Sequence, residues 1–364
     1  MSLDSVHSLR SFLLIVIALT VLVLGNLVWS LDYLYIPLGM DFVYQTRVFK
    51  TESETSSINR GFYFGKTVKP TTTRQEVTTS QLNNATLVRP DSCENCFEHN
   101  FKYIIQNEAV CNSLEKNSTI DLIVLVFTVH GHFQQRNILR QTWLLVSKEN
   151  KGTIRYVFLL GDTKDEDLSK KVEEENDVHH DIIKESFVDS YQNLTYKTIM
   201  GFKWVTNFCS KARFVMKTDD DMYVNLPALV PVLVKEETTL QSSVGGSCNL
   251  NAQPIREKNS KWFASVRSYP HKYYPGYCSG TGYVTSKSVT GKIYDISKTV
   301  PFFHLEDVYV ALCVKTLGFK LRHLPGFYAG KVKFDPCRMK SNRILTCHGL
   351  PMELFFKIRD AKCT

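Results

Sequence analysis

The chain has 364 residues, of which 43% are hydrophobic and 22% are charged, and its formal net charge is +8 at pH 7. That surplus of positive charge suits an anionic small ligand or a membrane surface. Nucleic acid is excluded as a partner, because the basic residues are interspersed with acids and because the membrane segment described next removes the chain from that compartment.

The first element along the chain is an uncharged apolar segment at 11–31, SFLLIVIALTVLVLGNLVWSL. A membrane-spanning helix needs about 20 such residues, so this segment can cross a bilayer once. A cleaved signal peptide is the alternative, but the apolar run exceeds the usual length and no small-x-small cleavage site precedes Asp32. We therefore predict a cytoplasmic tail at 1–10 and an uncleaved transmembrane signal anchor at 11–31.

The residues after this anchor have the features of an oxidising, luminal compartment. Three N-glycosylation sequons begin at Asn84, Asn117 and Asn193. All ten cysteines also follow the anchor, an even number consistent with disulfides whose pairing the sequence leaves open. Zinc at Cys93 and Cys96 is not expected, because no second Cys-x-x-Cys or spaced histidine pair completes a tetrahedral site.

The luminal part divides at about residue 118. Residues 32–117 lack sustained periodicity and include the Thr-rich run KTVKPTTTRQEVTTSQLNNAT, which cannot build a core. We predict a stem there. Residues 118–364 are enough for one substantial catalytic domain of the α/β class.

Strand and helix patterns alternate in the first half of that domain. Apolar β-rich runs predict strands, and amphipathic runs or a capping box predict helices. The predicted strands lie at 119–128, 155–161, 181–187 and 213–216; one helix is predicted at 133–150, and a second after a capping box of Asp189 and Gln192. This alternation predicts a mostly parallel, Rossmann-like sheet with flanking helices, whose ligands bind beyond the carboxyl ends of the strands.

Three consecutive carboxylates, Asp219, Asp220 and Asp221, follow the last of these strands. Neighbouring like charges repel, so such a cluster needs compensation. Carboxylate oxygens suit Mg²⁺ or Mn²⁺, and a D-x-D spacing puts two acids on one side of the chain. A solvated acidic turn is the alternative, but the apolar residues on both sides place the cluster at a sheet edge and favour a metal site.

Three cations of the predicted helices are candidates for binding a phosphate. Arg136 and Arg140 are four residues apart and share a helix face, so together they could clamp a diphosphate. Lys197 could reach a phosphate from the second helix. Solvated surface positions are the alternative for all three.

The second half of the domain adds five candidates. Gly280 lies in YCSGTGY, where backbone can approach a ligand closely or where a disulfide through Cys278 pins a turn. Trp262 could stack on a sugar face or belong to the core. Glu306 and Asp307 precede an apolar helix, where they complement its dipole or where one of them acts as a general base. His348 is a core or surface histidine by default and a third metal ligand if the chain folds back.

Taken together, six motifs in order resemble those of the beta-1,3-galactosyltransferase family. These are inverting enzymes of glycosyltransferase family 31, anchored in the Golgi membrane and built on a GT-A fold. The resemblance runs from about Ile120 to the C-terminus, with one departure at Ile138, where the first motif usually has Ala. The motifs are RNILRQTW, FLLG, DSYQNLTYKT, KTDDDMYVN, YCSGTGYV and EDVYVALC.

The resemblance implies a role for each matching residue. Asp307 is the expected catalytic base. The expected ligands of Mn²⁺ or another divalent cation are Asp221, Asp219 and His348. The residues expected near the UDP moiety are Arg136, Arg140, Lys197, Asp219 and Asp220, and those expected to contact substrate are Trp262, Gly280 and Glu306.

The implied reaction is metal-assisted transfer of galactose from UDP-galactose to a terminal GlcNAc or GalNAc of a glycoprotein or glycolipid, by a single inverting displacement. CSGTGY and HLEDVY resemble the galactosyl branch, with transfer of N-acetylgalactosamine or N-acetylglucosamine as the alternatives. The protein is then expected in the Golgi membrane as a single-pass type II protein with a luminal catalytic domain.

Two classes of protein outside the glycosyltransferases are weighed against this interpretation. A catalytically silent luminal glycan-binding protein is expected to lack Asp221 or Asp307, and both are present. A metal-dependent phosphoryl-transfer enzyme needs a second metal site and a phosphate-binding glycine loop, and the sequence has no such loop.

Overall fold

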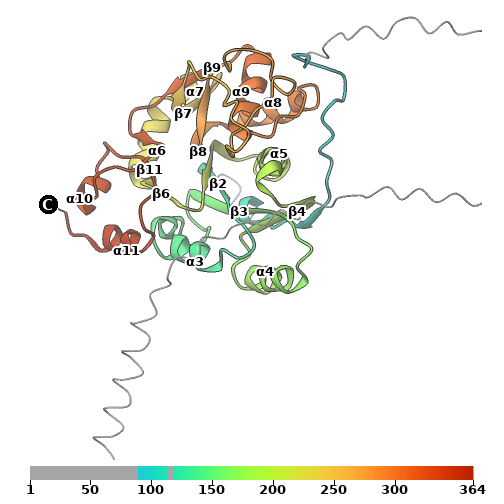
Figure 1. Ribbon diagram of the computed structural model, residues 1–364. Coiled ribbons are helices and arrows are strands. Elements are labelled where there is room, and N and C mark those ends of the chain that lie inside the picture. Colours follow the sequence, from blue (N-terminus) through green and yellow to red (C-terminus); the bar gives the residue numbers. More distant parts are fainter. Residues whose placement is uncertain (1–88, 113–118, 364) are drawn as a thin grey trace, which may run out of the picture. The chain divides into compact units, whose positions relative to one another are not determined.

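The computed structural model describes residues 89–112 and 119–363, all of which belong to one structural unit (Figure 1). The predicted tail and anchor at 1–31 and most of the predicted stem lie outside the described residues. Within the described ranges, no helix is long and apolar enough to cross a membrane.

Four parallel strands form the centre of an eight-stranded sheet, in the order β4, β3, β2, β5. They are β2 (Ile120–Phe127), β3 (Ile154–Asp162), β4 (Ile182–Val188) and β5 (Ala212–Asp219). Strand β2 is buried on both faces, with Ile123 and Leu125 in one hydrophobic core and Leu122 and Val124 in the other. The four predicted strands and the α/β class are confirmed.

The outer strands make the sheet mixed. Strand β8 (Tyr277–Ser286) runs antiparallel to β5, β7 (Ser243–Asn249) antiparallel to β8, and β1 (Tyr103–Ile105) antiparallel to β4, whereas β9 (Lys320–His323) is parallel to β7. The prediction of a mostly parallel sheet is therefore correct only for its centre. Residues 277–283 were predicted as a loop, but they form the first part of β8, whose pairing sets Gly282 opposite Thr218 at the carboxyl end of β5.

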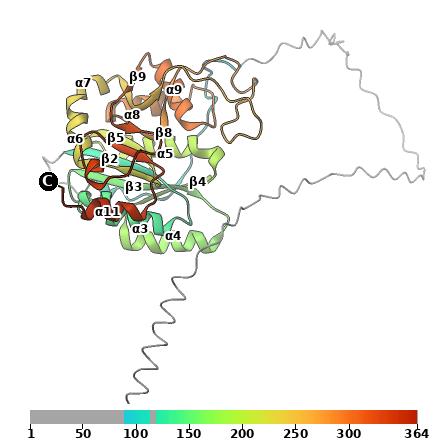
Figure 2. The same ribbon diagram turned by 60° about the vertical axis from the view of Figure 1, so that its left-hand side comes forward.

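Helices pack on both faces of this sheet. Their bounds are α2 (Ala109–Asn112), α3 (Phe133–Gln141), α4 (Glu166–His179), α5 (Leu194–Phe208), α6 (Leu226–Lys235), α7 (Glu237–Leu240), α8 (Lys287–Ser297), α9 (Glu306–Thr316), α10 (Pro336–Met339) and α11 (Glu353–Asp360). Ile199 of α5, Val289 of α8 and Val310 of α9 join one core, whereas Leu139 of α3 and Leu229 of α6 join the other. Figures 1 and 2 both show α8 and α9 on the opposite side of the unit from α3 and α4.

The helix predicted at 133–150 is shorter than expected. The α-helix α3 ends at Gln141, and a 3-10 helix follows at Trp143–Ser147. Residues 148–150 then adopt positive φ angles, which an α-helix of L-residues excludes. The predicted helix was too long because the helical pattern of apolar residues continues in the sequence beyond Gln141, where the α-helix ends.

Residues 89–112 are part of the folded unit, although the sequence predicts a stem there. Strand β1 pairs with β4, and Cys111 forms a disulfide with Cys209. The indole N–H of Trp204 donates to the carbonyl of Gln106 at 2.7 Å. The folded unit therefore begins before residue 118. The sequence does not reveal this, because a three-residue strand gives no periodic signal.

Eight of the ten cysteines form disulfides, all within the described ranges. The pairs are Cys93–Cys96, Cys111–Cys209, Cys248–Cys278 and Cys337–Cys363. The predicted use of cysteine for disulfides is thus confirmed, and the pairing that the sequence left open is resolved. Cys313 and Cys347 are buried free thiols.

Candidate active site

The consecutive aspartates lie where β5 ends, and the first two face different partners. Asp219 Oδ1 accepts a hydrogen bond from Lys217 Nζ at 2.7 Å. Asp220 Oδ2 lies 2.8 Å from His132 Nδ1, and this hydrogen bond raises the pKa of His132. Asp219 and Asp220 therefore each have a partner of their own, as expected for neighbouring like charges that need compensation.

The third aspartate meets His348 because the chain folds back. In a second sheet, β11 (Thr346–His348) lies between β10 (Phe327–Tyr328) and β6 (Met222–Val224), and its antiparallel pairing with β6 sets His348 opposite Met222. Asp221 Oδ2 is 3.1 Å from His348 Nε2. Among the described residues, no group of three or more His, Cys, Asp or Glu side chains is arranged to hold a metal ion. Asp221 and His348 therefore offer two donors at this place.

Asp307 lies in the first turn of α9, where two backbone N–H groups hold its carboxylate. Gly280 N donates to Oδ2 at 3.1 Å, and Val308 N donates to Oδ1 at 2.8 Å. Burial and the neighbouring charge of Glu306 raise the pKa of Asp307 to about 7. A carboxyl with that pKa can gain and lose a proton near neutral pH, which general acid or base catalysis requires.

Glu306 is buried, with only 4% of its surface exposed, and its contacts are with protein groups. Its Oε2 accepts hydrogen bonds from Thr198 Oγ1 and from the Tyr283 hydroxyl, both at 2.9 Å. Its Oε1 lies 3.1 Å from Lys217 Nζ. Glu306 is thus fixed behind Asp307, and direct contact with a substrate stays a prediction.

A pocket of about 260 Å³ opens beside Asp307. Its wall includes Trp262, which is 49% exposed, together with Tyr274, Tyr277 and Ser279. The structure thus brings two predicted site residues, Trp262 and Asp307, to one cavity. An exposed indole next to a titrating carboxyl suits a ligand that has an apolar face and a hydroxyl group.

The predicted arginines lie on one face of α3, and carboxylates of the chain bind both guanidinium groups. Arg136 is fully buried, pairs with Glu175 at 2.5 Å and donates to the carbonyl of His130. Arg140 pairs with Glu175 at 2.7 Å and with Asp181 at 2.8 Å. Arg136 therefore braces the loop after β2, whereas Arg140 joins α3 to α4 and to Asp181, just before β4. Direct binding of a diphosphate stays a prediction for both residues.

Lys197 is buried and ties the ends of two central strands together. Its Nζ donates to the carbonyl of Thr128, after β2, at 2.7 Å and lies 2.8 Å from Asp189, after β4. Asp189 also accepts a hydrogen bond from Gly161 N, so the prediction that it caps α5 is wrong. The N-cap of that helix is Asn193.

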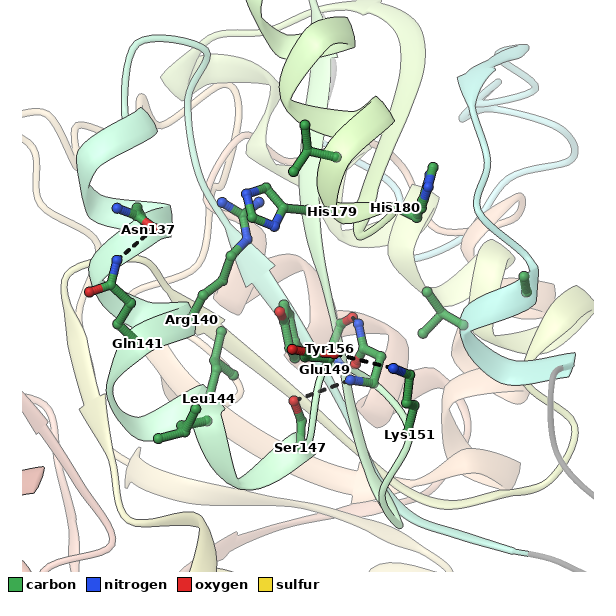
Figure 3. A pocket seen from close by; sticks show the side chains of 15 residues that line it. Asn137, Arg140, Gln141, Leu144, Ser147, Glu149, Lys151, Tyr156, His179 and His180 are labelled. Atoms are coloured by element: carbon green, nitrogen blue, oxygen red, sulfur yellow. Dashed lines mark hydrogen bonds and ion pairs between the residues drawn. The ribbon is translucent and has the colours of Figure 1, made fainter.

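A separate pocket of about 630 Å³ lies beside α3 and the end of α4. Figure 3 shows Arg140 and His179 side by side in its wall, and burial together with this guanidinium lowers the pKa of His179. Arg140 is the one predicted site residue among those that line this pocket. This cavity is distinct from the pocket at Asp307.

Sequence reasoning did not single out Lys217 or His132, although both contact the aspartates. Lys217 follows the apolar run FVM within β5, where a buried cation needs a nearby acid. His132 follows a central strand at its carboxyl end, where ligands of parallel sheets bind. Both signals were present in the sequence.

Comparisons with known proteins give one family. A family model described as Galactosyltransferase matches residues 134–325. Beta-1,3-galactosyltransferase 1 of Homo sapiens is 41% identical over 263 residues, which cover 71% of this chain and 78% of that protein. Beta-1,3-galactosyltransferase 5 of Pan paniscus is 42% identical over 230 residues, 62% of this chain and 75% of that protein. Among solved structures, the galactosyltransferase LgtC with donor and acceptor sugar analogues aligns over 65% of this chain and 95% of that one, with a TM-score of 0.35 and 10% identity.

Proposed function

Because the chain belongs to the galactosyltransferase family, we propose that it is a beta-1,3-galactosyltransferase that moves galactose from UDP-galactose to a terminal GlcNAc or GalNAc of a glycoprotein or glycolipid. The observation that carries this proposal is the proximity of two features at one end of β5. The acidic cluster 219–221 ends that strand, and the carboxylate of Asp307 is hydrogen-bonded to the neighbouring β8. Acids beyond the carboxyl ends of parallel strands also support a GT-A fold.

Asp307 acts as the general base in the proposed reaction. Its ionised carboxylate accepts the proton of the acceptor hydroxyl while that oxygen forms a bond to C1 of galactose. The bond from C1 to the β-phosphate oxygen breaks at the same time, and UDP leaves with the electron pair. Because attack comes from the face opposite UDP, an α-linked donor yields a β-linked product.

Asp221 and His348, with Asp219 nearby, are the proposed ligands of Mn²⁺ or another divalent cation. Asp221 Oδ2 and His348 Nε2 are 3.1 Å apart, and the two side chains are 57% and 38% exposed, so an ion can reach both from solvent. A carboxylate and an imidazole fit such an ion, and a diphosphate can supply further oxygen ligands. When bound, the cation neutralises negative charge on the UDP leaving group.

The nucleotide is proposed to lie along the loop that follows β2. Asp220 and His132 border this loop through their hydrogen bond. Arg136 donates to backbone carbonyls of the same loop, and Lys197 holds its first residue. We propose that these two cations shape the UDP site, and that Arg140 acts through Glu175 of α4, a carboxylate that it shares with Arg136.

The acceptor sugar is proposed to bind in the 260 Å³ pocket at Asp307. The half-exposed indole of Trp262 offers a flat apolar face for a sugar ring. The N–H of Gly280 holds the carboxylate of Asp307, which lines this pocket, and Glu306 lies next to Asp307 in the chain with its own carboxylate near Lys217. With the ring stacked on Trp262, a hydroxyl can face the carboxylate of Asp307.

The protein is proposed to act in the Golgi lumen as a single-pass type II membrane protein. The apolar segment at 11–31, which lies outside the described residues, supports this proposal. Disulfides in the described domain agree with an oxidising compartment. Fractionation with protease protection of the full chain would test it: a domain digested in intact vesicles would contradict a luminal location.

A donor-by-acceptor panel tests the reaction. The purified full chain is assayed for UDP release with UDP-galactose, UDP-GalNAc and UDP-GlcNAc against GlcNAc-, GalNAc- and galactose-terminated acceptors in Mn²⁺. We expect the highest turnover with UDP-galactose and a GlcNAc or GalNAc acceptor. Turnover with UDP-GalNAc or UDP-GlcNAc alone would reassign the donor, and binding of glycans without any turnover would identify a silent glycan-binding protein.

A further inference from the structure

Lys217 is a buried cation in β5, two residues before Asp219. Its side chain is 2% exposed, and its Nζ lies 4.2 Å from the ring centroid of Phe127. Removing an ammonium group from water is costly unless anions or dipoles replace the solvent. The surroundings of Lys217 must therefore supply that compensation.

Three oxygen atoms from three different segments surround the ammonium group. They are Asp219 Oδ1 at 2.7 Å, Glu306 Oε1 at 3.1 Å and the carbonyl oxygen of Gly280. Asp219 belongs to the acidic cluster, Glu306 begins α9, and Gly280 lies in β8. One side chain thus joins the three elements that carry the proposed metal site and the base.

Gly280 transmits this contact directly to Asp307. Its carbonyl accepts from Lys217, and its N–H donates to Asp307 Oδ2 at 3.1 Å. A Cβ at position 280 would lie 2.6 Å from Glu306 Oε1, so the backbone already lies against the acids. Displacing Lys217 would release the strand segment that holds the carboxylate of Asp307.

Other buried lysines in the described part of the chain have simpler surroundings. Lys184, Lys197 and Lys203 each pair with one carboxylate, those of Asp162, Asp189 and Glu185 respectively. Each of the three also donates to one neutral oxygen, which is the Ser169 hydroxyl for Lys184, the Thr128 carbonyl for Lys197 and the Phe101 carbonyl for Lys203. Lys217 differs because it bridges two carboxylates on opposite sides of the candidate site.

We propose that Lys217 is a positioning residue, which fixes Asp307 relative to the aspartates 219–221 by binding Asp219, Gly280 and Glu306 at once. The predicted loss of catalysis rests on the proposed function. Without Lys217, the carboxylate of Asp307 would shift relative to the substrate, and a misplacement of about 1 Å can lower a rate about 100-fold.

The test compares Lys217→Met with Lys203→Met in the full chain. Methionine keeps most of the apolar stem of lysine and removes its charge. Lys203 is the control because it too is largely buried, at 10% exposed against 2% for Lys217, and pairs with a carboxylate, but lies between β4 and the 89–112 segment. Steady-state kinetics give kcat and KM per folded molecule, and hydrogen exchange measures protection of the peptide at 277–283. Calorimetry measures Mn²⁺-dependent UDP binding.

For Lys217→Met we expect kcat to fall about 100-fold, with a smaller change in KM for the acceptor. Amides at 277–283 should exchange about 10-fold faster, and metal-dependent UDP binding should weaken because Asp219 loses its partner. Lys203→Met should leave all three quantities at the wild-type value. A folded Lys217→Met protein with normal kcat and normal protection at 277–283 would overturn the proposal.

Glu306→Gln decides the matter if Lys217→Met does not fold. Glutamine retains an oxygen for Thr198 and Tyr283 and removes the charge that faces Lys217. We expect a fall in kcat of about 10-fold with faster exchange at 277–283, and unchanged values of both would overturn the proposal. If the wild type transfers no sugar, the proposed function fails, whereas the exchange data still test the positioning role.

Discussion

The chemistry of the candidate site depends on the environment of one carboxyl group. Asp307 is buried next to Glu306, and both effects raise its pKa, whereas the N–H groups of Gly280 and Val308 and the charge of Lys217 lower it. The result is a pKa of about 7, which is close to the working pH of a general base. A solvated aspartate would be ionised at neutral pH but would be a much weaker base.

The pH dependence of turnover follows from this shift. Asp307 must be ionised to accept a proton, so kcat/KM should rise with pH through about 7 and fall below it. Glu306→Gln removes a negative neighbour and should move this acid limb to lower pH. A profile with an acid limb near 4 in the wild type would show that another group, or a solvated carboxyl, is the base.

Residue-level signals predicted the candidate residues better than their contacts. The acidic triplet, the Glu306–Asp307 pair and the exposed Trp262 all lie at the β5 edge or at the pocket beside it. The contacts of Arg136 and Arg140 were not foreseeable, because Glu175 is 35 residues or more away in sequence. Pattern reasoning identifies residue types suited to a chemistry, but long-range pairing decides which of them are free.

At the scale of elements, the antiparallel strand β8 builds the site against β5. Within β8, the carbonyl of Gly280 accepts a hydrogen bond from Lys217, and its N–H donates to Asp307. Because β8 is antiparallel, its first residues lie at the carboxyl end of β5, whereas a parallel neighbour would bring its last residues there. The sequence predicted the loop as a close-approach position but not the strand direction.

Gly280→Ala tests this close packing. The added Cβ would meet Glu306 Oε1 at 2.6 Å, and Glu306 is held by Thr198 and Tyr283, so it cannot move aside. We expect a loss of about 1–3 kcal/mol in unfolding free energy and a clear fall in kcat. Gly282→Ala is the matched control, because its Cβ would contact Met216 at an ordinary 3.5 Å. Equal effects of the two changes on kcat would contradict the role of Gly280.

The pairing of β11 with β6 makes a second prediction at this scale. Asp221→Ala and His348→Ala should each weaken Mn²⁺-dependent binding of UDP by about 10-fold or more, because the ion loses one of two protein donors. Calorimetry with UDP, with and without Mn²⁺, measures this directly. His180→Asn, an exposed histidine at the end of α4, should have no effect. Unchanged affinity in both alanine variants would place the ion elsewhere.

At the scale of the whole described unit, central strands were predicted well and edges were not. Buried parallel strands give short, continuous apolar runs rich in β-branched residues, and their length and flanking turn residues favour a strand over a buried helix. Strand β1 has three residues and derives its stability from pairing with β4 and from the Cys111–Cys209 disulfide, which a local pattern cannot reveal. The predicted boundary at 118 therefore cuts into the folded unit.

The disulfide between Cys111 and Cys209 should stabilise the whole unit more than a local one. It spans a sequence separation of 98, compared with 3 for Cys93–Cys96. Replacing the first pair by serine should lower the unfolding free energy by about 4–5 kcal/mol, and replacing the second by about 2 kcal/mol or less, because loop-closure entropy grows with loop length. Urea unfolding of the two double variants measures the difference, and equal losses would contradict this account.

The most direct test of the account separates binding from transfer in one variant. Asp307→Asn removes the proposed base and leaves Asp219, Asp221 and His348 in place. Transfer of galactose from UDP-galactose should fall by about 1000-fold, while calorimetric affinity for UDP in Mn²⁺ should stay within about twofold of the wild type. Near-normal transfer by Asp307→Asn would contradict the assignment of the base and, with it, the proposed mechanism.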